Sequence, residues 1–346
     1  MRIGLITYHH SNNYGAILQS YATYRALNEL GHDVEFINIQ QQERKKLRHL
    51  AFIFKTLSFK KFRKKFYPKE TQYIKNMEEL KEAKFNYDCL IVGSDQVWNP
   101  NISLDKCLAY FLDFGDINVH RISYASSFGI SKWPDNKKNL IPLISKLLKK
   151  FDSISVREKT GQDLLLTQFG VHSQIVLDPT MLHKDYNEIA NNIEKKNDII
   201  CYLLNRTEEQ LKASRYISLI TKHPLKLISN IYPIPGFKYV YPPSIQKWIK
   251  YIGGAHLVIT DSFHGLVFSL LYRRNFIILA VENGKNSRLL DLLDLLGLQD
   301  RYFTSLEQLK ENYKNIKEID YTKIGTIIEK KRNESWAFLK KSLSFD

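Results

Sequence analysis

Short apolar runs alternate with longer amphipathic segments along the first half of the chain. The apolar runs have the length and composition of buried strands, and they occupy residues 3–7, 33–39, 87–92, 121–125, 153–156 and 174–177. Apolar residues recur at helical spacing in segments 14–30, 140–149 and 158–169, and Gly31 and Gly170 stand where two of these helices should stop. Strands that alternate with helices in this way favour a parallel, doubly wound sheet.

A second alternation follows the polar stretch 187–197. Strands are predicted at 198–204, 225–229, 256–260 and 276–281, and helices at 208–221, 244–252 and 266–272. Beyond residue 281 helices dominate. A length of 346 residues suits two α/β domains of roughly 150 residues each.

We therefore predict an α/β protein made of two Rossmann-like domains that face each other across a cleft. The N-terminal domain should span residues 1–185 and carry a basic helical insertion at 41–85, and the C-terminal domain should span 186–320. The last helix, residues 321–346, could cross back over the junction. Ligands of open α/β sheets bind at the carboxyl ends of the strands, so the site should lie in the loops that follow strands.

The composition indicates a globular cytoplasmic protein. No apolar stretch approaches the roughly 18 residues of a membrane span, and the first ten residues lack the features of a signal peptide. Cys89, Cys107 and Cys201 are scattered, and we expect buried thiols rather than a disulfide framework or a metal site. The protein should be cytoplasmic or peripheral to the inner face of the membrane.

Positive charge is concentrated in one segment. The chain has 51 Lys and Arg against 36 Asp and Glu, a net charge of +15, and the basic residues crowd between Arg44 and Phe66 among aromatic and aliphatic side chains. Segment 44–66 suits a helix that lies on an anionic membrane surface. The alternative is a solvated insertion whose apolar residues pack on its own domain. No recognition motif accompanies the charge, so nucleic acid is not expected as a partner.

Polar turns follow two predicted strands of the first domain. Asn13, Tyr14 and Gly15 come after the first strand, where backbone N–H groups at a helix start could meet an anion or simply be capped. His9 and His10 precede them, but adjacent residues rarely point to one ion, and so we predict no metal ligands. The second turn contains Ser94, Asp95, Gln96 and Trp98. It could line the cleft on the acceptor side, or it could be a structural turn with Trp98 in the core.

Two further junctions between a strand and a helix carry candidate chemistry. Arg157 could fork onto a carboxylate or phosphate, or pair with Glu158. At the other junction, Asp261 or Ser262 can cap the next helix, His264 can meet an anion or move a proton, and Gly265 leaves room for a ligand.

Six motifs, in order, make the chain resemble the polysaccharide pyruvyl transferase family of bacterial exopolysaccharide and capsule biosynthesis. They are Asn13-Tyr14-Gly15-Ala16-Ile17-Leu18-Gln19, Gly93-Ser94-Asp95-Gln96-Val97-Trp98-Asn99, Tyr124-Ala125-Ser126-Ser127-Phe128-Gly129, Ser155-Val156-Arg157-Glu158, Leu177-Asp178-Pro179-Thr180 and Thr260-Asp261-Ser262-Phe263-His264-Gly265. The resemblance implies a fold like that of the two-domain glycosyltransferases (GT-B-like).

The same resemblance implies transfer of a pyruvyl group from phosphoenolpyruvate to a sugar or lipid-linked oligosaccharide, with no cofactor. His264 matches the family's active-site histidine, and we add Asp261 as a second catalytic candidate. Arg157 matches an arginine that follows a strand in the family. Some members carry an arginine where this chain has Ser262. Arg157, Arg288 or Lys285 would then hold the donor phosphate, beside Ser262 and Gly265 at the helix start.

Two other functions fit the same architecture. A nucleotide-sugar glycosyltransferase would hold a diphosphate at the turn that contains His264, but such enzymes often carry an acid in the following helix, and residues 266–272 contain none. A non-catalytic glycan-binding protein is the second alternative, because Ser262 departs from the pattern of those members.

Overall fold

A computed structural model describes residues 1–39, 50–67, 69–229, 233–281 and 286–344, and the chain divides into two compact units. The first unit comprises Met1–Lys45, Phe66–His183 and Ile328–Asp346, and the second comprises Lys46–Lys65 and Lys184–Ile327. Of the basic insertion, the described residues 50–65 therefore group with the second unit, whereas the sequence placed the whole insertion in the N-terminal domain.

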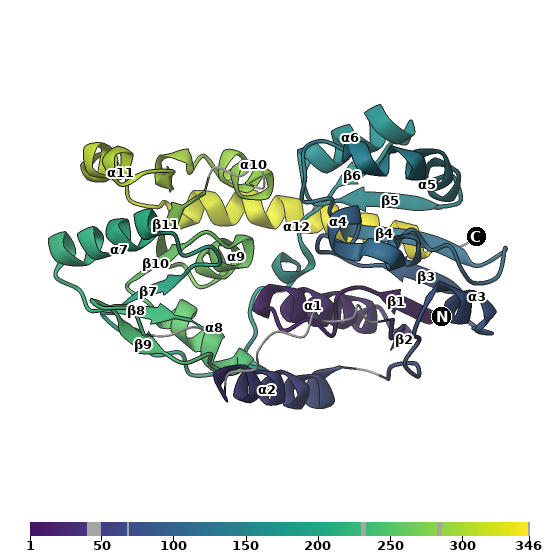
Figure 1. Ribbon diagram of the computed structural model, residues 1–346, viewed down its shortest axis with the longest axis horizontal. Coiled ribbons are helices and arrows are strands. Elements are labelled where there is room, and N and C mark those ends of the chain that lie inside the picture. Colours follow the sequence, from purple (N-terminus) through teal and green to yellow (C-terminus); the bar gives the residue numbers. More distant parts are fainter. Residues whose placement is uncertain (40–49, 68, 230–232, 282–285, 345–346) are drawn as a thin grey trace. The chain divides into compact units, whose positions relative to one another are not determined.

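The described residues of the first unit form a six-stranded parallel sheet in the order β2-β1-β3-β4-β5-β6 (Figure 1). The strands are β1 (Arg2–Ile6), β2 (Asp33–Phe36), β3 (Cys89–Val92), β4 (His120–Ser126), β5 (Ser153–Val156) and β6 (Gln174–Ile175). The helices are α1 (Tyr14–Glu29), α3 (Met77–Glu82), α4 (Pro100–Ser103), α5 (Ile141–Leu148) and α6 (Lys159–Phe169), with short 3₁₀ helices at Leu104–Phe111, Asp135–Leu140 and Pro179–Met181.

Both faces of this sheet are buried, which explains why its strands read as continuous apolar runs. Successive side chains of a strand point to opposite faces. Along β3, Cys89 and Ile91 therefore join one core cluster, while Leu90 and Val92 join the other. A sheet with one face in solvent would show alternating apolar and polar residues. Strand β3 shows no such alternation.

The second unit repeats the architecture with a parallel sheet in the order β12-β11-β10-β7-β8-β9. Its described strands are β7 (Ile199–Tyr202), β8 (Leu225–Ile228), β9 (Lys238–Val240), β10 (Leu257–Thr260), β11 (Asn275–Leu279) and β12 (Tyr302–Phe303). Its helices are α2 (Leu50–Phe66), whose last residue falls in the first unit, α7 (Glu208–Thr221), α8 (Ile245–Gly254), α9 (Phe263–Leu271), α10 (Ser287–Leu296) and α11 (Leu306–Asn312), with 3₁₀ turns at Gln299–Arg301 and Tyr313–Asn315.

Helix α12 (Tyr321–Leu343), yellow in Figure 1, contributes to both units. Near its start, the Tyr321 hydroxyl donates to the Arg274 carbonyl of the second unit (2.5 Å). Near its end, Leu339 and Leu343 join a core cluster of the first unit. The expected last helix is thus present, and its second half is part of the first unit.

Helix α2 presents two different faces. Phe59 and Phe62 are buried, but Ile53, Phe54 and Leu57 are 42%, 69% and 58% exposed. The apolar residues of the basic segment therefore pack only in part, and the helix keeps an apolar surface. None of the described helices is long and apolar enough to cross a membrane.

Candidate functional site

The turn between β10 and α9 is fixed by its own hydroxyl groups. The Thr260 hydroxyl donates to the Tyr202 carbonyl (2.6 Å) and accepts from the Ser262 N–H (3.0 Å). Ser262 is the N-cap of α9, and its hydroxyl accepts the Gly265 N–H at 3.4 Å. The structure thus assigns to Ser262 the helix cap that the sequence left open between Asp261 and Ser262.

Asp261 ties this turn to the loop after the neighbouring strand β7. One carboxylate oxygen accepts the Leu204 N–H (2.6 Å); the other accepts the Asn205 N–H (3.0 Å), the Asn205 side-chain amide (2.8 Å) and the Gln210 amide (3.2 Å). Four donors therefore hold one buried carboxylate. These contacts make Asp261 a positioning residue; its catalytic role stays a prediction.

His264 lies in the first turn of α9 and is only 6% exposed, with its ring edge-on to Phe263. The next residue, Gly265, is required for a reason other than the expected room for a ligand. A Cβ at this position would lie 2.4 Å from the Thr260 hydroxyl oxygen, so only glycine lets α9 pack this closely on β10. The glycine therefore sets the position of the His264 backbone.

Of the expected phosphate-binding cations, Arg288 lies half-buried in the first turn of α10, and Lys285 lies outside the described residues. Arg206 was not among the residues expected from the sequence; it follows β7 in a left-handed conformation (φ 52°). Its guanidinium donates to the Ser229 hydroxyl at 2.5 Å. Because β7 is the neighbour of β10, Arg206 is at the same edge of the sheet as the turn that contains His264.

Arg157, in the first unit, is the centre of a buried ion-pair network. Its guanidinium contacts Asp178 (2.6 Å), Asp95 (3.5 Å) and Glu158 (3.6 Å), and it also donates to the Ser94 hydroxyl (3.2 Å). Burial alone would lower the pKa of Arg157, but the three carboxylates, Asp178 foremost, raise it above its ordinary value. The expected pairing with Glu158 is present. Contact with a donor phosphate stays a prediction.

The turn after β3 supports this network. Asp95 is held at φ 75°, a conformation that costs energy for a residue with a Cβ. Gln96 is half-buried and its carbonyl accepts the Tyr8 hydroxyl (3.2 Å). Trp98 is fully buried, stacks on Phe111 and donates to a backbone carbonyl. Trp98 is therefore the core residue of the structural alternative, not a cleft residue.

The turn after β1 begins helix α1. Asn13 is the N-cap, and its side chain accepts the N–H groups of Gly15 (2.8 Å) and Ala16 (3.4 Å). Tyr14 and Gly15 are buried, whereas Asn13 is exposed. Capping thus accounts for the Asn-Tyr-Gly motif locally, and Asn13 is its solvent-facing member.

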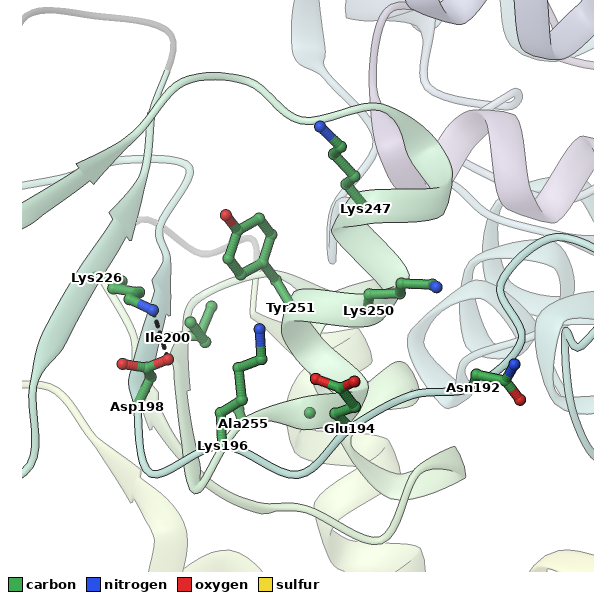
Figure 2. Close-up of a pocket in the computed structure, with 11 residues that line it drawn as sticks. Asn192, Glu194, Lys196, Asp198, Ile200, Lys226, Lys247, Lys250, Tyr251 and Ala255 are labelled. Atoms are coloured by element: carbon green, nitrogen blue, oxygen red, sulfur yellow. Dashed lines mark hydrogen bonds and ion pairs between the residues drawn. The ribbon is translucent and has the colours of Figure 1, made fainter.

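A cavity of about 350 Å³ lies at the amino ends of the strands of the second sheet, opposite the ends that the turn with His264 follows (Figure 2). It opens where β7, β8 and β10 begin, and four lysines line it together with Tyr251: Lys196, Lys226, Lys247 and Lys250. Lys226 pairs with Asp198 at 2.5 Å, and Glu194 adds a second carboxylate to the lining. This cavity is separate from the turn that contains His264, because that turn follows the end of β10.

Every described candidate residue follows the carboxyl end of a strand, except Arg288, which begins a helix. Within the first unit, the fold brings Ser94, Asp95 and Arg157 together. Within the second, it brings Asp261, Ser262, His264 and Gly265 onto one turn. The partners Asp178, Asn205 and Gln210 were not predicted from the sequence, although Asp178 lies in the Leu-Asp-Pro-Thr motif.

A family model described as polysaccharide pyruvyl transferase matches residues 13–283, most of the chain and parts of both units. No curated protein matches the chain.

Solved structures resemble the whole chain at low sequence identity. A putative UDP-N-acetylglucosamine 2-epimerase from Listeria monocytogenes is 14% identical with a TM-score of 0.56, over 98% of this chain and 95% of that one. The UDP-GlcNAc 2-epimerase from Neisseria meningitidis, bound to UDP-GlcNAc, is 8% identical with a TM-score of 0.57, over 99% of both chains. A glycosyltransferase from Rickettsia africae is 10% identical with a TM-score of 0.53, over 99% and 94%. These likenesses confirm the predicted GT-B-like α/β fold.

Proposed function

The chain belongs to the polysaccharide pyruvyl transferase family, and from this premise we propose that it transfers a pyruvyl group from phosphoenolpyruvate to a sugar. The acceptor is a bacterial surface polysaccharide or its lipid-linked precursor, and the product is a pyruvate ketal on two sugar hydroxyls. The observation that carries the proposal is the family match over residues 13–283, which includes the turn that contains His264.

The reaction needs one proton delivered and two removed. An acid protonates the CH₂ carbon of the enol, which leaves an oxocarbenium-like centre at the neighbouring carbon. One sugar hydroxyl attacks that carbon and loses its proton; the C–O bond to phosphate then breaks, and the second hydroxyl attacks and loses its proton. One of the two removed protons restores the acid and the other ends on the departing phosphate. The products are the ketal and hydrogen phosphate, so atoms and charge balance without an oxidant or reductant.

His264 is the proposed acid. An imidazole can both donate and accept a proton, which suits general acid–base catalysis. Its backbone is held by the Ser262 cap and by the close packing of Gly265 on Thr260, and Asp261 fixes the adjacent loop. A catalytic group gains from such rigid placement, because misplacement by about 1 Å can cost a hundredfold in rate.

The donor phosphate is proposed to lie at the start of α9, where backbone N–H groups and the helix dipole favour an anion. Arg206 is the cation that we assign to it, since Arg206 follows β7, the strand beside β10. Asn205, its neighbour in sequence, is bonded to Asp261, which adjoins the cap Ser262. We thus propose for Arg206 the phosphate-binding role for which the sequence suggested Arg157, Arg288 or Lys285.

The test is phosphate release from phosphoenolpyruvate with a panel of nitrophenyl and lipid-linked hexosides. We expect acceptor-dependent release by the wild type, and its loss by about 10²–10⁴-fold in His264→Ala, the usual contribution of a general acid. His256→Ala is the matched control, because His256 is exposed and directly precedes β10.

A nucleotide-sugar glycosyltransferase would give a different result. The Neisseria meningitidis neighbour binds UDP-GlcNAc, whereas α9 of this chain, FHGLVFSLL, has no acidic residue. Thermal stabilisation by a nucleotide sugar, with no phosphate released from phosphoenolpyruvate, would favour the glycosyltransferase. Glycan binding without phosphate release and without stabilisation by a nucleotide sugar would favour a non-catalytic glycan-binding protein.

We also propose that α2 holds the protein at an anionic membrane surface. Its exposed residues are apolar in the first turns (Ile53, Phe54, Leu57) and basic in the last turns, at Lys60, Lys61, Lys64 and Lys65. Basic and apolar side chains on one helix suit interfacial binding, and a lipid-linked acceptor would make that location useful.

A further inference from the structure

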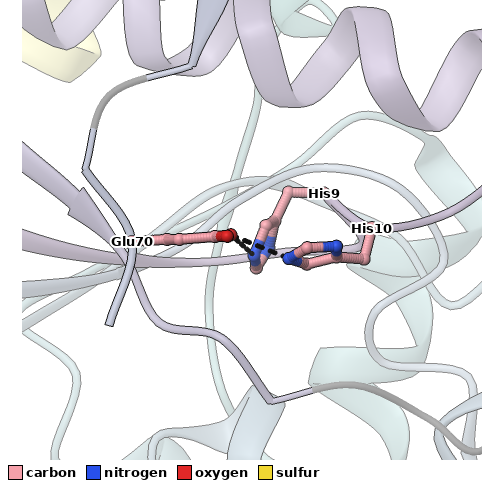
Figure 3. Close-up of side chains that lie close together, drawn as sticks. All are labelled: His9, His10 and Glu70. Atoms are coloured by element: carbon pink, nitrogen blue, oxygen red, sulfur yellow. Dashed lines mark hydrogen bonds and ion pairs between the residues drawn. The ribbon is translucent and has the colours of Figure 1, made fainter. Parts of the chain in front are cut away.

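Three side chains with metal-binding atoms meet beside the first strand of the first unit (Figure 3). They are His9 and His10, on the turn after β1, and Glu70, on the segment before α3. Their ligand atoms all lie within 4.8 Å of one another. Glu70 Oε2 is 2.8 Å from His10 Nε2 and 3.7 Å from His9 Nε2. Figure 3 shows both rings turned towards the same carboxylate.

The adjacency of the two histidines does not separate their rings, as the sequence argument assumed. Neighbours in an extended strand point to opposite faces. Here the strand has ended at Ile6, and the Ser11 N–H bonds to the Tyr8 carbonyl (3.2 Å), so the backbone turns between them. The ring centroids of His9 and His10 are consequently only 4.6 Å apart. The expectation of no metal ligands rested on the rule that adjacent residues rarely point to one ion, and this turn brings the two rings together.

His9 is held in the orientation that a metal ligand needs. Its ring is buried and lies parallel to the Phe36 ring, with centroids 4.6 Å apart and an interplanar angle of 10°. Its Nδ1 is 3.0 Å from the Thr7 carbonyl, which can only accept, so Nδ1 carries the hydrogen. In the neutral ring, Nε2 is then the atom with the lone pair. A hydrogen bond from the other ring nitrogen to a carbonyl is typical of metal-binding histidines.

Glu70 is placed by the same phenylalanine. The Phe36 N–H bonds to the Lys69 carbonyl (3.0 Å), and the Thr71 N–H bonds to the Phe36 carbonyl (2.9 Å). Glu70 thus lies on a segment aligned along the end of β2, although it is 60 residues from His10 in sequence. The backbone of Phe36 fixes one ligand and its ring fixes another, so the site is largely preformed.

From this geometry we propose that His9, His10 and Glu70 bind a divalent transition-metal ion of the Zn²⁺ class. The Nε2 lone pair of neutral His9 faces a carboxylate oxygen 3.7 Å away, and a cation between these two atoms would bind to both. Two imidazoles and one carboxylate form the donor set of many zinc sites with an open fourth position. Mg²⁺ and Ca²⁺ prefer all-oxygen sites and fit less well.

The two distances to Glu70 suit such an ion after small movements, and the two histidine nitrogens, which lie within 4.8 Å of each other, must also approach. Zn–N and Zn–O bonds of about 2.0–2.2 Å in a tetrahedron place ligand atoms roughly 3.3 Å apart. The His9–Glu70 pair must close slightly and the His10–Glu70 pair must open slightly. His10 and Glu70 can move, because their side chains are 22% and 43% exposed, while His9 is fixed. Binding replaces the proton shared by His10 and Glu70 with the metal.

The test is titration of the full-length, tag-free chain with Co²⁺ and Zn²⁺ after removal of metals by a chelator. We expect one Co²⁺ per chain, with the visible d–d bands of a tetrahedral site, and displacement by Zn²⁺. His10→Ala and Glu70→Gln should each weaken binding by at least about tenfold, since loss even of a second-shell partner costs about 10–100-fold. Circular dichroism should show that both variants stay folded, because neither side chain is buried.

His223→Ala is the matched control. His223 and His256 form a second histidine pair, with ring centroids 3.9 Å apart, and the described residues place no third metal ligand beside it. This variant should bind Co²⁺ like the wild type. The proposal is overturned if the wild type shows no saturable band, if His10→Ala and Glu70→Gln bind undiminished, or if His223→Ala alone abolishes the band. None of these results depends on the transferase reaction, so a failure here leaves the proposed function intact.

Discussion

The buried carboxylate of Asp261 accepts four hydrogen bonds. Because so many donors hold it in place, we assign Asp261 a positioning role and not a catalytic one. Both of its oxygens are engaged by Leu204, Asn205 and Gln210, which belong to the loop and helix after β7. The residue thus links two strand ends. His264, by contrast, lies in the helix that this link supports.

We predict that Asp261→Asn lowers both the melting temperature and the rate of phosphate release. An amide presents one acceptor and one donor group where the carboxylate accepts on both sides, so at least one N–H of the β7 loop loses its partner. Such a loss costs about 1–3 kcal/mol. Thermal unfolding followed by circular dichroism measures the effect, and Asp105→Asn, at an exposed position, is the control. A variant with full stability but no activity would make Asp261 catalytic instead.

Single residues show what sequence patterns can and cannot predict. The motif that contains His264 was found because its residues are contiguous, and so was the serine that caps α9. Asp178 and Glu70 were not recognised as partners, because Asp178 lies 21 residues from Arg157 and Glu70 lies 60 from His10. Trp98 lay in a polar motif that left its role open between cleft and core, and its burial against Phe111 shows that it is a core residue.

Helix α2 carries a buried lysine whose charge disfavours folding. Lys55 is 6% exposed, and burial, with a smaller effect from Arg206, lowers the pKa of Lys55 to about 8. Between pH 8 and the ordinary lysine pKa of about 10.4, the unfolded chain binds more protons than the folded one. Stability therefore rises with pH across this window, and the cost of the buried charge is fully present below it.

Lys55→Met should accordingly be more stable than the wild type at pH 7, by up to about 3 kcal/mol, given about 1.4 kcal/mol per pKa unit. The difference should shrink as the pH rises from 8 to 10. Urea denaturation at several pH values measures it. Lys60→Met, on the exposed side of the helix, should show a difference that does not change with pH. A Lys55→Met advantage that is constant with pH would mean that apolar packing, not charge, causes it.

The exposed side of α2 gives a separate prediction. Substituting glutamine at Lys60, Lys61, Lys64 and Lys65 should weaken binding to anionic phospholipid vesicles at least about 100-fold, because each lysine near such a surface contributes about 1 kcal/mol. Vesicle sedimentation measures binding, with neutral phosphatidylcholine vesicles for comparison. Glutamine at four exposed lysines of the first unit removes the same charge and should have little effect: Lys75, Lys146, Lys149 and Lys150. Equal losses in both variants would mean that net charge, not α2, determines binding.

At the level of elements, long periodic segments were predicted well, whereas the two short edge strands of the second sheet were not. The last helix was expected from residue 321, where α12 begins. Strands β9 and β12, at the two edges of the second sheet, have only three and two residues and show no pattern of their own. The grouping of α2 with the second unit was also unpredictable, since it depends on contacts far along the chain.

For the whole molecule, two repeats of strand and helix alternation were enough to predict two parallel α/β sheets, and the GT-B-like arrangement was implied by the resemblance of the motifs. The repeats were visible because each sheet is parallel and buried on both faces, which makes its strands uniformly apolar. The division of α12 was not visible. One amphipathic helix can pack in two cores, and its hydrophobic pattern does not indicate which residues pack in which core.

That division makes a prediction about stability. Leu339, in the second half of α12, is 1% exposed and packs in the first unit with residues such as Leu5 and Ile91. Leu339→Ala removes buried methyl groups and leaves a cavity, which typically costs about 2–5 kcal/mol. We expect faster hydrogen exchange in β1 and β3 of the first unit, measured by mass spectrometry, and little change in β7 and β10.

Leu227→Ala supplies the reciprocal variant, since Leu227 is fully buried in the core cluster of the second unit. It should accelerate exchange in β7 and β10 and spare β1 and β3. The start of α12 should respond to Leu227→Ala, because Tyr321 is bonded to Arg274 of the second unit, and its end should respond to Leu339→Ala. If each variant accelerates exchange equally in both sheets, the units unfold together and α12 couples them. Opposite patterns would establish two cooperative units that share one helix.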